Sequence, residues 1–222
     1  MRWNAPTKLT NPHQRWLGFL CFCCILPPTQ MLRREVEPCV HLLNPANVEY
    51  EVVRTSLLPG ALKTAQFNRA IPIKDGVRLF EISDVVVKDP EADTGARNCR
   101  RLVATYMGPT AGFEIIHGLI DRIMGLVQVE QSEWYATGAL RATAGSGPWR
   151  EGLHYGIRQA ERDTFFPGRC ADVILEVGGA NGQQTKEVCL GSFGILHPEV
   201  LEAFELHHPC SAVEIDLELL MS

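Results

Sequence analysis

Apolar residues recur at helical intervals between positions 112 and 127. The members of this face are Phe113, Ile116, Ile120, Ile123, Met124 and Val127. Because intervals of three and four residues place side chains on one face of an α-helix, the pattern predicts an amphipathic helix that packs against a sheet. His117 follows the apolar position 116 and is expected at the surface or boundary of this helix. No carboxylate or thiol partner is evident for it, so it makes no case for catalysis.

A second segment with helical spacing lies at 57–69. Its apolar positions are Leu57, Leu58, Ala61, Leu62, Ala65 and Phe67. Thr55 or Ser56 can cap this helix by accepting backbone N–H bonds, and Pro59 is acceptable in the first turn, where its missing N–H costs nothing. The helix is predicted to end before Pro72, because the residue before a proline disfavours helical geometry.

Runs rich in β-branched residues, bounded by turn-forming residues, predict the strands. They lie at 78–87, 101–107, 171–177, 187–191 and 212–217, and an extended stretch lies at 48–53. The first two strands are expected to pair antiparallel, and the next two to form a hairpin. A short helix is expected to open at His197-Pro198 and to run to about Phe204. Since strands cluster around a few helices without regular βαβ alternation, the predicted fold class is α+β, an antiparallel sheet flanked by helices.

Length and charge divide the chain unevenly. Its 222 residues correspond to roughly 1.5 domains. Residues 1–34 contain five basic residues and no acidic one, which leaves 16 basic and 26 acidic residues and a charge of −10 for residues 35–222. We therefore expect a leader without a defined fold at 1–34 and a folded domain at 40–222. The leader is open to two interpretations, a targeting segment or a non-folding extension with Met31 as an alternative start.

The same features bear on partners and on location. The chain has no run of 18 apolar residues, so no membrane association is expected. An acidic body does not favour nucleic-acid binding. Arg97, Arg100 and Arg101 form a compact basic group, interpreted as a solvated loop or, alternatively, as an RNA or phosphate contact. Eight cysteines in a chain without convincing secretory features indicate reduced thiols and a cytoplasmic location.

Metal and phosphate motifs are weak. Cys21 and Cys24 have no second pair at zinc spacing, and His207, His208 and Cys210 lack a fourth ligand, so an ordinary turn around position 209 is expected and no metal site is predicted. The glycine-rich loop at 138–152 contains no P-loop pattern.

Five ordered segments together carry a family resemblance. They read RTSLLPG at 54–60, LFEISD at 79–84, GFEIIHG at 112–118, FFPGRCA at 165–171 and GILHPEV at 194–200. From about residue 40 to its end, the chain resembles the C-terminal, class II core-like part of the β subunit of phenylalanyl-tRNA synthetase, of the cytosolic archaeal and eukaryotic type. The resemblance implies a class II type of antiparallel sheet. It also implies an α2β2 ligase whose α subunit holds the ATP and phenylalanine site.

Class II chemistry uses arginines to hold the ATP phosphates, because fixed positive charge stabilises the transferring phosphoryl oxygens. In class II enzymes one of these arginines belongs to an Arg-x-Glu motif on a sheet strand. Here Arg78 and Glu81 are three residues apart instead of two, so they should point to opposite faces of the strand. After the glycines at 191 and 194 the chain continues with Ile195-Leu196-His197-Pro198, without an arginine. No catalytic residue is therefore predicted in this chain, and no cofactor. ATP and Mg²⁺ are expected only for the complete enzyme.

On this resemblance, the motif residues are instead expected to support the fold and to contact the α subunit. They are Arg54, Pro59, Gly60, Glu81, Phe166, Pro167, Gly168, Arg169, His197 and Pro198. The expected function is that of a β-subunit module that supports attachment of phenylalanine to tRNA-Phe, with tRNA contacted indirectly or weakly. A truncated domain that binds the α subunit without supporting activity, and a freestanding enzyme, are the alternatives. The family's β subunit is several times longer, so the chain is interpreted as a piece of a larger subunit.

Overall fold

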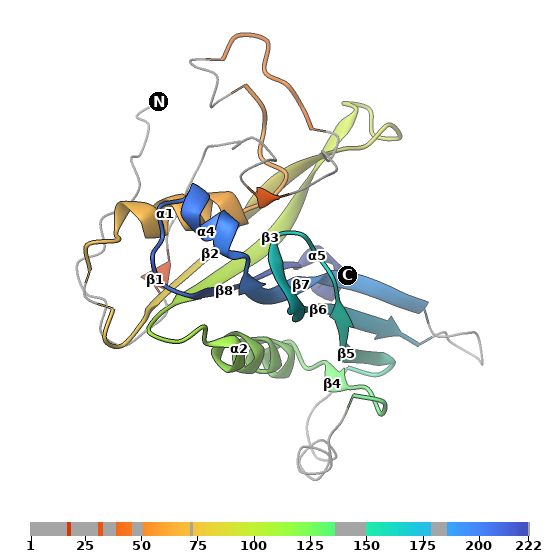
Figure 1. The fold of residues 1–222 in the computed structure, drawn as a ribbon. Coiled ribbons are helices and arrows are strands. Elements are labelled where there is room, and N and C mark those ends of the chain that lie inside the picture. Colours follow the sequence, from red (N-terminus) through yellow and green to blue (C-terminus); the bar gives the residue numbers. More distant parts are fainter. Residues whose placement is uncertain are drawn as a thin grey trace.

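The computed structural model of the chain describes residues 17–18, 31–32, 39–45, 51–71, 73–135, 150–178 and 186–221. These residues form an eight-stranded sheet in the order β1-β2-β3-β8-β7-β6-β5-β4, with helices on both faces (Figure 1). The strands are β1 (Leu17–Gly18), β2 (Val77–Lys88), β3 (Ala96–Met107), β4 (Glu130–Gln131), β5 (Leu153–Ala160), β6 (Phe165–Val177), β7 (Lys186–Leu196) and β8 (Cys210–Asp216). The helices are α1 (Leu58–Phe67), α2 (Phe113–Leu126), α4 (Pro198–Ala203) and α5 (Glu218–Met221).

The predicted α+β class is confirmed. The long strands pair antiparallel with one another, and parallel pairing is confined to the contacts of the two-residue strands β1 and β4 with β2 and β5. The predicted pairing of the first two strands is confirmed by β2 and β3, where Leu79 lies opposite Thr105. The predicted hairpin is confirmed by β6 and β7, where Leu175 lies opposite Val188.

The sheet separates two hydrophobic cores. Alternate strand residues point to opposite faces, so Leu79 of β2 and Val103 of β3 pack with α1, and α4 covers the same face. On the other face, Ala104 and Val213 pack with α2. The predicted packing of α2 is confirmed because Ile116, Ile120 and Met124 are fully buried.

Three sequence-based strand boundaries were wrong. The second strand was expected to begin at residue 101, but β3 begins at Ala96, so the hairpin of β2 and β3 is longer than predicted and projects from the body in Figure 1. Asp84 lies directly opposite Arg100 and forms an ion pair with it, which explains how polar residues extend the strand pair. β6 likewise begins at Phe165 rather than at 171, and β7 runs to Leu196 rather than ending at 191. β5 was not predicted at all.

Part of the predicted leader lies against the domain. Leu17 and Gly18 pair with Leu79 and Phe80 of β2. Met31 is 2% exposed within the α1-side core, and its carbonyl oxygen accepts a hydrogen bond of 2.8 Å from the Thr164 hydroxyl. The division of the chain at residue 34 remains a prediction, because the rest of 1–34 lies outside the described residues.

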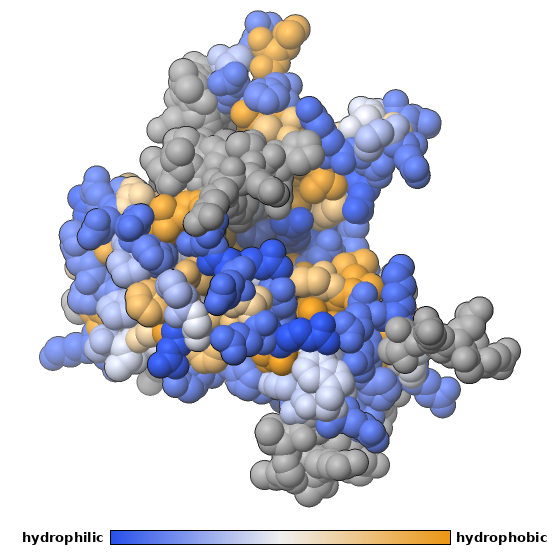
Figure 2. All heavy atoms as spheres, turned by 45° about the vertical axis from the view of Figure 1, so that its right-hand side comes forward, coloured by the Kyte–Doolittle hydropathy of each residue, from blue (hydrophilic) through white to orange (hydrophobic). Residues whose placement is uncertain are grey.

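Most of the glycine-rich loop at 138–152 and of the loop after residue 178 also lies outside the described residues. Within the part of the chain that the structure describes, no helix is both long and apolar enough to cross a membrane. The face drawn in Figure 2 is mostly hydrophilic, and its hydrophobic residues form small groups, several of them around a central recess.

Candidate functional site

Arg54 and Glu81 form a buried ion pair between the segment before α1 and strand β2. The Arg54 Nη1 atom lies 2.9 Å from Glu81 Oε1, and the two side chains are 11% and 0% exposed. The same guanidinium donates to the Asp84 carbonyl oxygen at 3.0 Å and to the Ser83 hydroxyl. Two predicted site residues that are 27 positions apart in the chain are thus brought together, and they fix the approach to α1.

A second charged cluster caps the start of α1. The Glu214 carboxylate, on β8, accepts hydrogen bonds from the backbone N–H groups of Leu57 at 3.1 Å and Leu58 at 3.2 Å, and from the Ser56 hydroxyl at 2.6 Å. Arg101 Nη1 donates to Glu214 at 3.2 Å and to the Thr55 carbonyl oxygen at 2.9 Å. A carboxylate at a helix N-terminus is favourable because it meets unpaired N–H groups and the positive end of the helix dipole.

The predicted capping role of Ser56 is therefore secondary. Its hydroxyl lies 3.4 Å from the Leu58 nitrogen, whereas the main acceptor is Glu214. Pro59 and Gly60 occupy the buried first turn of α1, and the Gly60 carbonyl oxygen accepts a hydrogen bond of 3.0 Å from the Thr64 hydroxyl. Sequence reasoning missed Glu214 and the role of Arg101, because a carboxylate on the last strand gives no local signal that it caps a distant helix.

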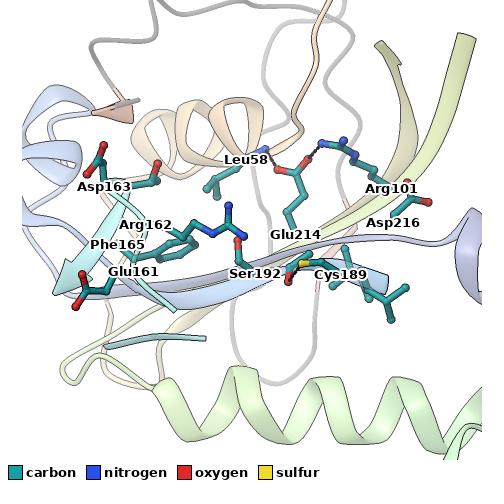
Figure 3. Close-up of a pocket in the computed structure, with 14 residues that line it drawn as sticks. Leu58, Arg101, Glu161, Arg162, Asp163, Phe165, Cys189, Ser192, Glu214 and Asp216 are labelled. Atoms are coloured by element: carbon teal, nitrogen blue, oxygen red, sulfur yellow. Dashed lines mark hydrogen bonds and ion pairs between the residues drawn. The ribbon is translucent and has the colours of Figure 1, made fainter. Parts of the chain in front are cut away.

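A cavity of about 570 Å³ opens beside this cap (Figure 3). It is lined by Leu58, Arg101, Glu161, Arg162, Asp163, Thr164, Phe165, Cys189, Leu190, Gly191, Ser192, Glu214, Ile215 and Asp216. In Figure 3 the Arg162 side chain reaches into the cavity, and Glu214 bonds to Leu58 on one side and to Arg101 on the other. Sequence reasoning did not assemble this cavity, which collects residues from α1, four strands and the turn before β6.

The cavity does not fit a triphosphate. Its lining holds four carboxylates, of Glu161, Asp163, Glu214 and Asp216, against two guanidinium groups, so it carries excess negative charge. Arg101 is paired with Glu214, and Arg162 is paired with Asp172, whose Oδ2 lies 2.8 Å from Arg162 Nη2. Phosphate oxygens would therefore meet arginines that already bind carboxylates, in a lining where carboxylates outnumber arginines.

Arg78 and Glu81, which stand in place of the phosphate-binding strand motif of class II enzymes, point to opposite faces of the sheet, as predicted. Glu81 lies on the α1 face with Arg54, whereas the Arg78 guanidinium carbon lies 5.2 Å from the ring centroid of Tyr106, in the core on the α2 face. Within the described residues, no group of three or more His, Cys, Asp or Glu side chains is placed to hold a metal ion. His207 and His208 are exposed and Cys210 is buried, and burial raises the pKa of the Cys210 thiol to about 12.

The other predicted residues gather at an exposed part of the sheet. Between the paired positions Phe165 and Cys170, strand β6 shifts register, and Phe166, Pro167, Gly168 and Arg169 are all exposed. The Phe166 ring stacks with the His197 ring at a centroid distance of 6.3 Å. We call the four exposed residues together with His197 the β6 bulge.

The N-terminus of α4 supports the β6 bulge. The His197 Nδ1 atom accepts a hydrogen bond of 3.3 Å from the Glu199 backbone N–H, and Pro198 is the first residue of α4. The His197 backbone N–H also donates to the Thr164 carbonyl oxygen at 3.0 Å. The predicted site residues therefore form two groups, one around the start of α1 and one at the β6 bulge.

His117 lies at the predicted boundary position, but the expectation that it lacks a carboxylate partner was wrong. Its Nε2 atom lies 2.6 Å from the Tyr135 hydroxyl, and its Nδ1 atom lies 3.7 Å from Asp121 Oδ2. The Tyr155 hydroxyl donates to Asp121 at 3.0 Å. Burial, and the Asp121 charge, raise the pKa of Tyr135. The cluster links α2 to β5, and its residues do not line the cavity beside α1.

The basic group Arg97, Arg100 and Arg101 lies on β3, so its interpretation as a loop was wrong. Each arginine forms an ion pair within the chain: Arg97 with Asp89, Arg100 with Asp84, and Arg101 with Glu214. The positive charge of this group is already balanced, which does not favour the alternative interpretation as a phosphate contact.

Comparisons with known proteins agree with the motif resemblance. Residues 29–217 match the family model described as the phenylalanyl tRNA synthetase beta chain CLM domain. The chain is 46% identical over 179 residues to the phenylalanine–tRNA ligase beta subunit of Mus musculus, and the aligned part covers 81% of this chain and 26% of that protein. It is 44% identical over 184 residues to that of Drosophila melanogaster, with coverage of 82% and 26%. It is 40% identical over 192 residues to a cytoplasmic beta subunit of Arabidopsis thaliana, with coverage of 86% and 29%. The chain thus spans little more than a quarter of these relatives.

Proposed function

The chain belongs to the family of the phenylalanyl-tRNA synthetase beta chain CLM domain, and from this premise we propose that it acts as a β-subunit module of a phenylalanine–tRNA ligase. In this proposal the module assembles with a catalytic α subunit and thereby supports ATP-dependent attachment of phenylalanine to tRNA-Phe. The alternative of a domain that binds the α subunit without supporting activity is not favoured by the names of the relatives.

The proposal gives this chain no catalytic step. It is supported by one observation above all: the cavity beside α1 has surplus carboxylates, and both of its arginines are already paired with carboxylates. ATP and Mg²⁺ would therefore be used by the α subunit of an α2β2 enzyme. What this chain supplies is a class II type of core whose buried ion pairs hold α1 in place and whose exposed motifs remain available for the partner.

Partners and location follow the same reasoning. Residues 35–222 carry a charge of −10, so a tRNA contact by this part of the chain would be weak or indirect. The Arabidopsis thaliana relative is named as cytoplasmic, which supports a cytoplasmic location for this chain.

Co-purification with the α subunit, followed by two activity assays, tests the proposal. We expect a stable complex that shows phenylalanine-dependent ATP–pyrophosphate exchange and aminoacylates tRNA-Phe, whereas the chain alone shows no exchange. Exchange by the purified chain alone would overturn the non-catalytic assignment. A chain that fails to bind the α subunit would overturn the subunit assignment, and a complex without aminoacylation would reduce the chain to an interaction domain.

A further inference from the structure

Both outer edges of the sheet end in a strand of two residues. β1 lies beside β2, and β4 lies beside β5, each in parallel pairing. So short a strand adds little to the stability of a sheet, but it occupies backbone groups at the edge. Unpaired N–H and C=O groups at a sheet edge can bind a strand of another chain, and proteins avoid this by covering their edges. β1 therefore covers part of the edge of β2.

Two segments divide the edge of β2 between them. The Arg54 Nε atom donates to the Asp84 carbonyl oxygen at 3.0 Å, and the Arg54 carbonyl oxygen accepts from the Val86 N–H at 2.9 Å. Because strand residues alternate in the direction of their backbone groups, those of the even-numbered residues at 78–82 also point outward. Within the described part of the chain, β1 is the only backbone segment that pairs with β2 on this side at 78–82.

β1 comes from outside the family domain. The match to the family model begins at residue 29, whereas β1 lies at 17–18. The same N-terminal segment is held a second time at Met31, which is 2% exposed and whose carbonyl oxygen accepts a hydrogen bond of 2.8 Å from the Thr164 hydroxyl. Deletion of β1 leaves this second contact in place. The edge of β2 can thus be uncovered without removing any residue of the matched domain.

The stretch of β2 beneath β1 is complementary to a second copy of itself. In an antiparallel pair centred on Phe80, each Phe80 faces its counterpart and each Arg78 faces Ile82 of the other copy, so no like charges lie opposite one another. Ile82 is 44% exposed and shares a face of the strand with Phe80, which is partly buried against the α2-side core. β2 contains no glycine or proline, which would weaken such pairing.

We propose that β1 keeps the chain from associating with itself, and that a second copy of the chain pairs antiparallel with residues 78–82 of β2 when β1 is absent. A second copy is favoured as the occupant because an antiparallel pair about a twofold axis gives both strands the same donors, acceptors and side-chain contacts, and it closes after two copies. The paired stretch is short, so the association is weak and depends on concentration. The inference concerns this chain alone and is independent of the α subunit.

The mass of the chain in solution, followed over a range of protein concentrations, tests this role of β1. A variant that lacks residues 2–18 is expected to self-associate about tenfold more strongly or more, because the uncovered edge gains intermolecular hydrogen bonds. The matched control lacks residues 2–12 and keeps β1, so it should behave as the unchanged chain. The full-length double variant Leu17→Pro/Gly18→Pro removes both N–H donors of β1 and should repeat the effect without a deletion. If neither variant self-associates more than the unchanged chain, the proposal is wrong.

Charges at position 82 test the pairing register. In the variant without residues 2–18, Ile82→Lys would lie opposite Arg78 of the other copy and should abolish self-association, whereas Ile82→Glu would place a carboxylate there and should preserve it. Ile82 is exposed, so both substitutions should leave the melting temperature unchanged. Equal effects of the two charges would show that the copies do not pair through this edge.

Hydrogen exchange reports on the same edge without relying on association. Amides at 78–82 should exchange faster in a dilute solution of the variant without residues 2–18 than in the unchanged chain, and they should slow again as the protein concentration rises. Identical exchange in the two chains would show that β1 does not cover β2 and would overturn the proposal. Because no α subunit takes part in these measurements, such a result would leave the proposed function untouched.

Discussion

Replacing Arg54 by methionine tests whether the motif before α1 works through buried charge. The substitution keeps an apolar stem but removes the guanidinium from Glu81, whose side chain is 0% exposed. A buried carboxylate that loses a paired cation destabilises a protein by about 3 to 5 kcal/mol. That is a large part of a typical free energy of unfolding of about 5 to 15 kcal/mol.

The Arg69–Glu205 pair provides a control of similar geometry. Its two atoms lie 2.6 Å apart, but the side chains are 52% and 60% exposed, so Arg69→Met should cost no more than about 1 kcal/mol. The contrast between the two substitutions therefore depends on burial and not on distance.

Urea unfolding measures both effects as changes in the free energy of unfolding, with the slope m as a check that the denatured state is unchanged. The double variant Arg54→Met/Glu81→Leu is expected to recover much of the loss, because apolar residues can replace a buried ion pair at little cost. Equal losses of stability in Arg54→Met and Arg69→Met, or a double variant no more stable than Arg54→Met alone, would contradict a stabilising role for the buried ion pair.

Three further predictions concern packing, backbone and thiols. Ile120→Ala should lower the free energy of unfolding by about 2 to 5 kcal/mol, since Ile120 is fully buried, and an unchanged melting temperature would contradict that burial. Gly118→Ala should stabilise the chain by about 0.5 to 1 kcal/mol in urea unfolding, because a Cβ there meets no atom within 4 Å inside a helix. Gly191→Ala should instead strongly destabilise it, since its Cβ would lie 2.0 Å from a backbone oxygen of β8, and equal stability of the two variants would argue against this close approach. Alkylation at pH 8 followed by peptide mass mapping should leave Cys170 and Cys210 unmodified until urea is added, because burial raises the pKa of both thiols to about 12, and rapid modification of either in the folded chain would contradict it.

The elements with strong local patterns were predictable from sequence. Helix α2 was expected at 112–127 and runs from Phe113 to Leu126, because a 3.6-residue period needs no tertiary information. The paired strands β2 and β3 were found because β-branched runs alternate with turn residues.

β5 was missed because its pattern is weak and its stability comes from pairing. The strand carries polar residues at several positions, and it acquires its structure by lying opposite β6, where His154 faces Glu176 and Arg158 faces Asp172. Strand propensity reflects such neighbours as much as the residues themselves, so a sequence window does not reveal it.

The motif residues were found, but the charged partners that explain them were only partly found. Arg54 and Glu81 belong to recognisable segments, whereas Glu214 lies 157 positions from the helix end that it caps. Both clusters act on the same point: Arg54 ties the approach to α1 onto β2, and Glu214 ties its first N–H groups to β8. Since Leu58 and Glu214 also line the cavity, the arrangement that fixes α1 also places a carboxylate there. In the proposed non-catalytic module, the charge that would repel a triphosphate is thus part of what holds the fold together.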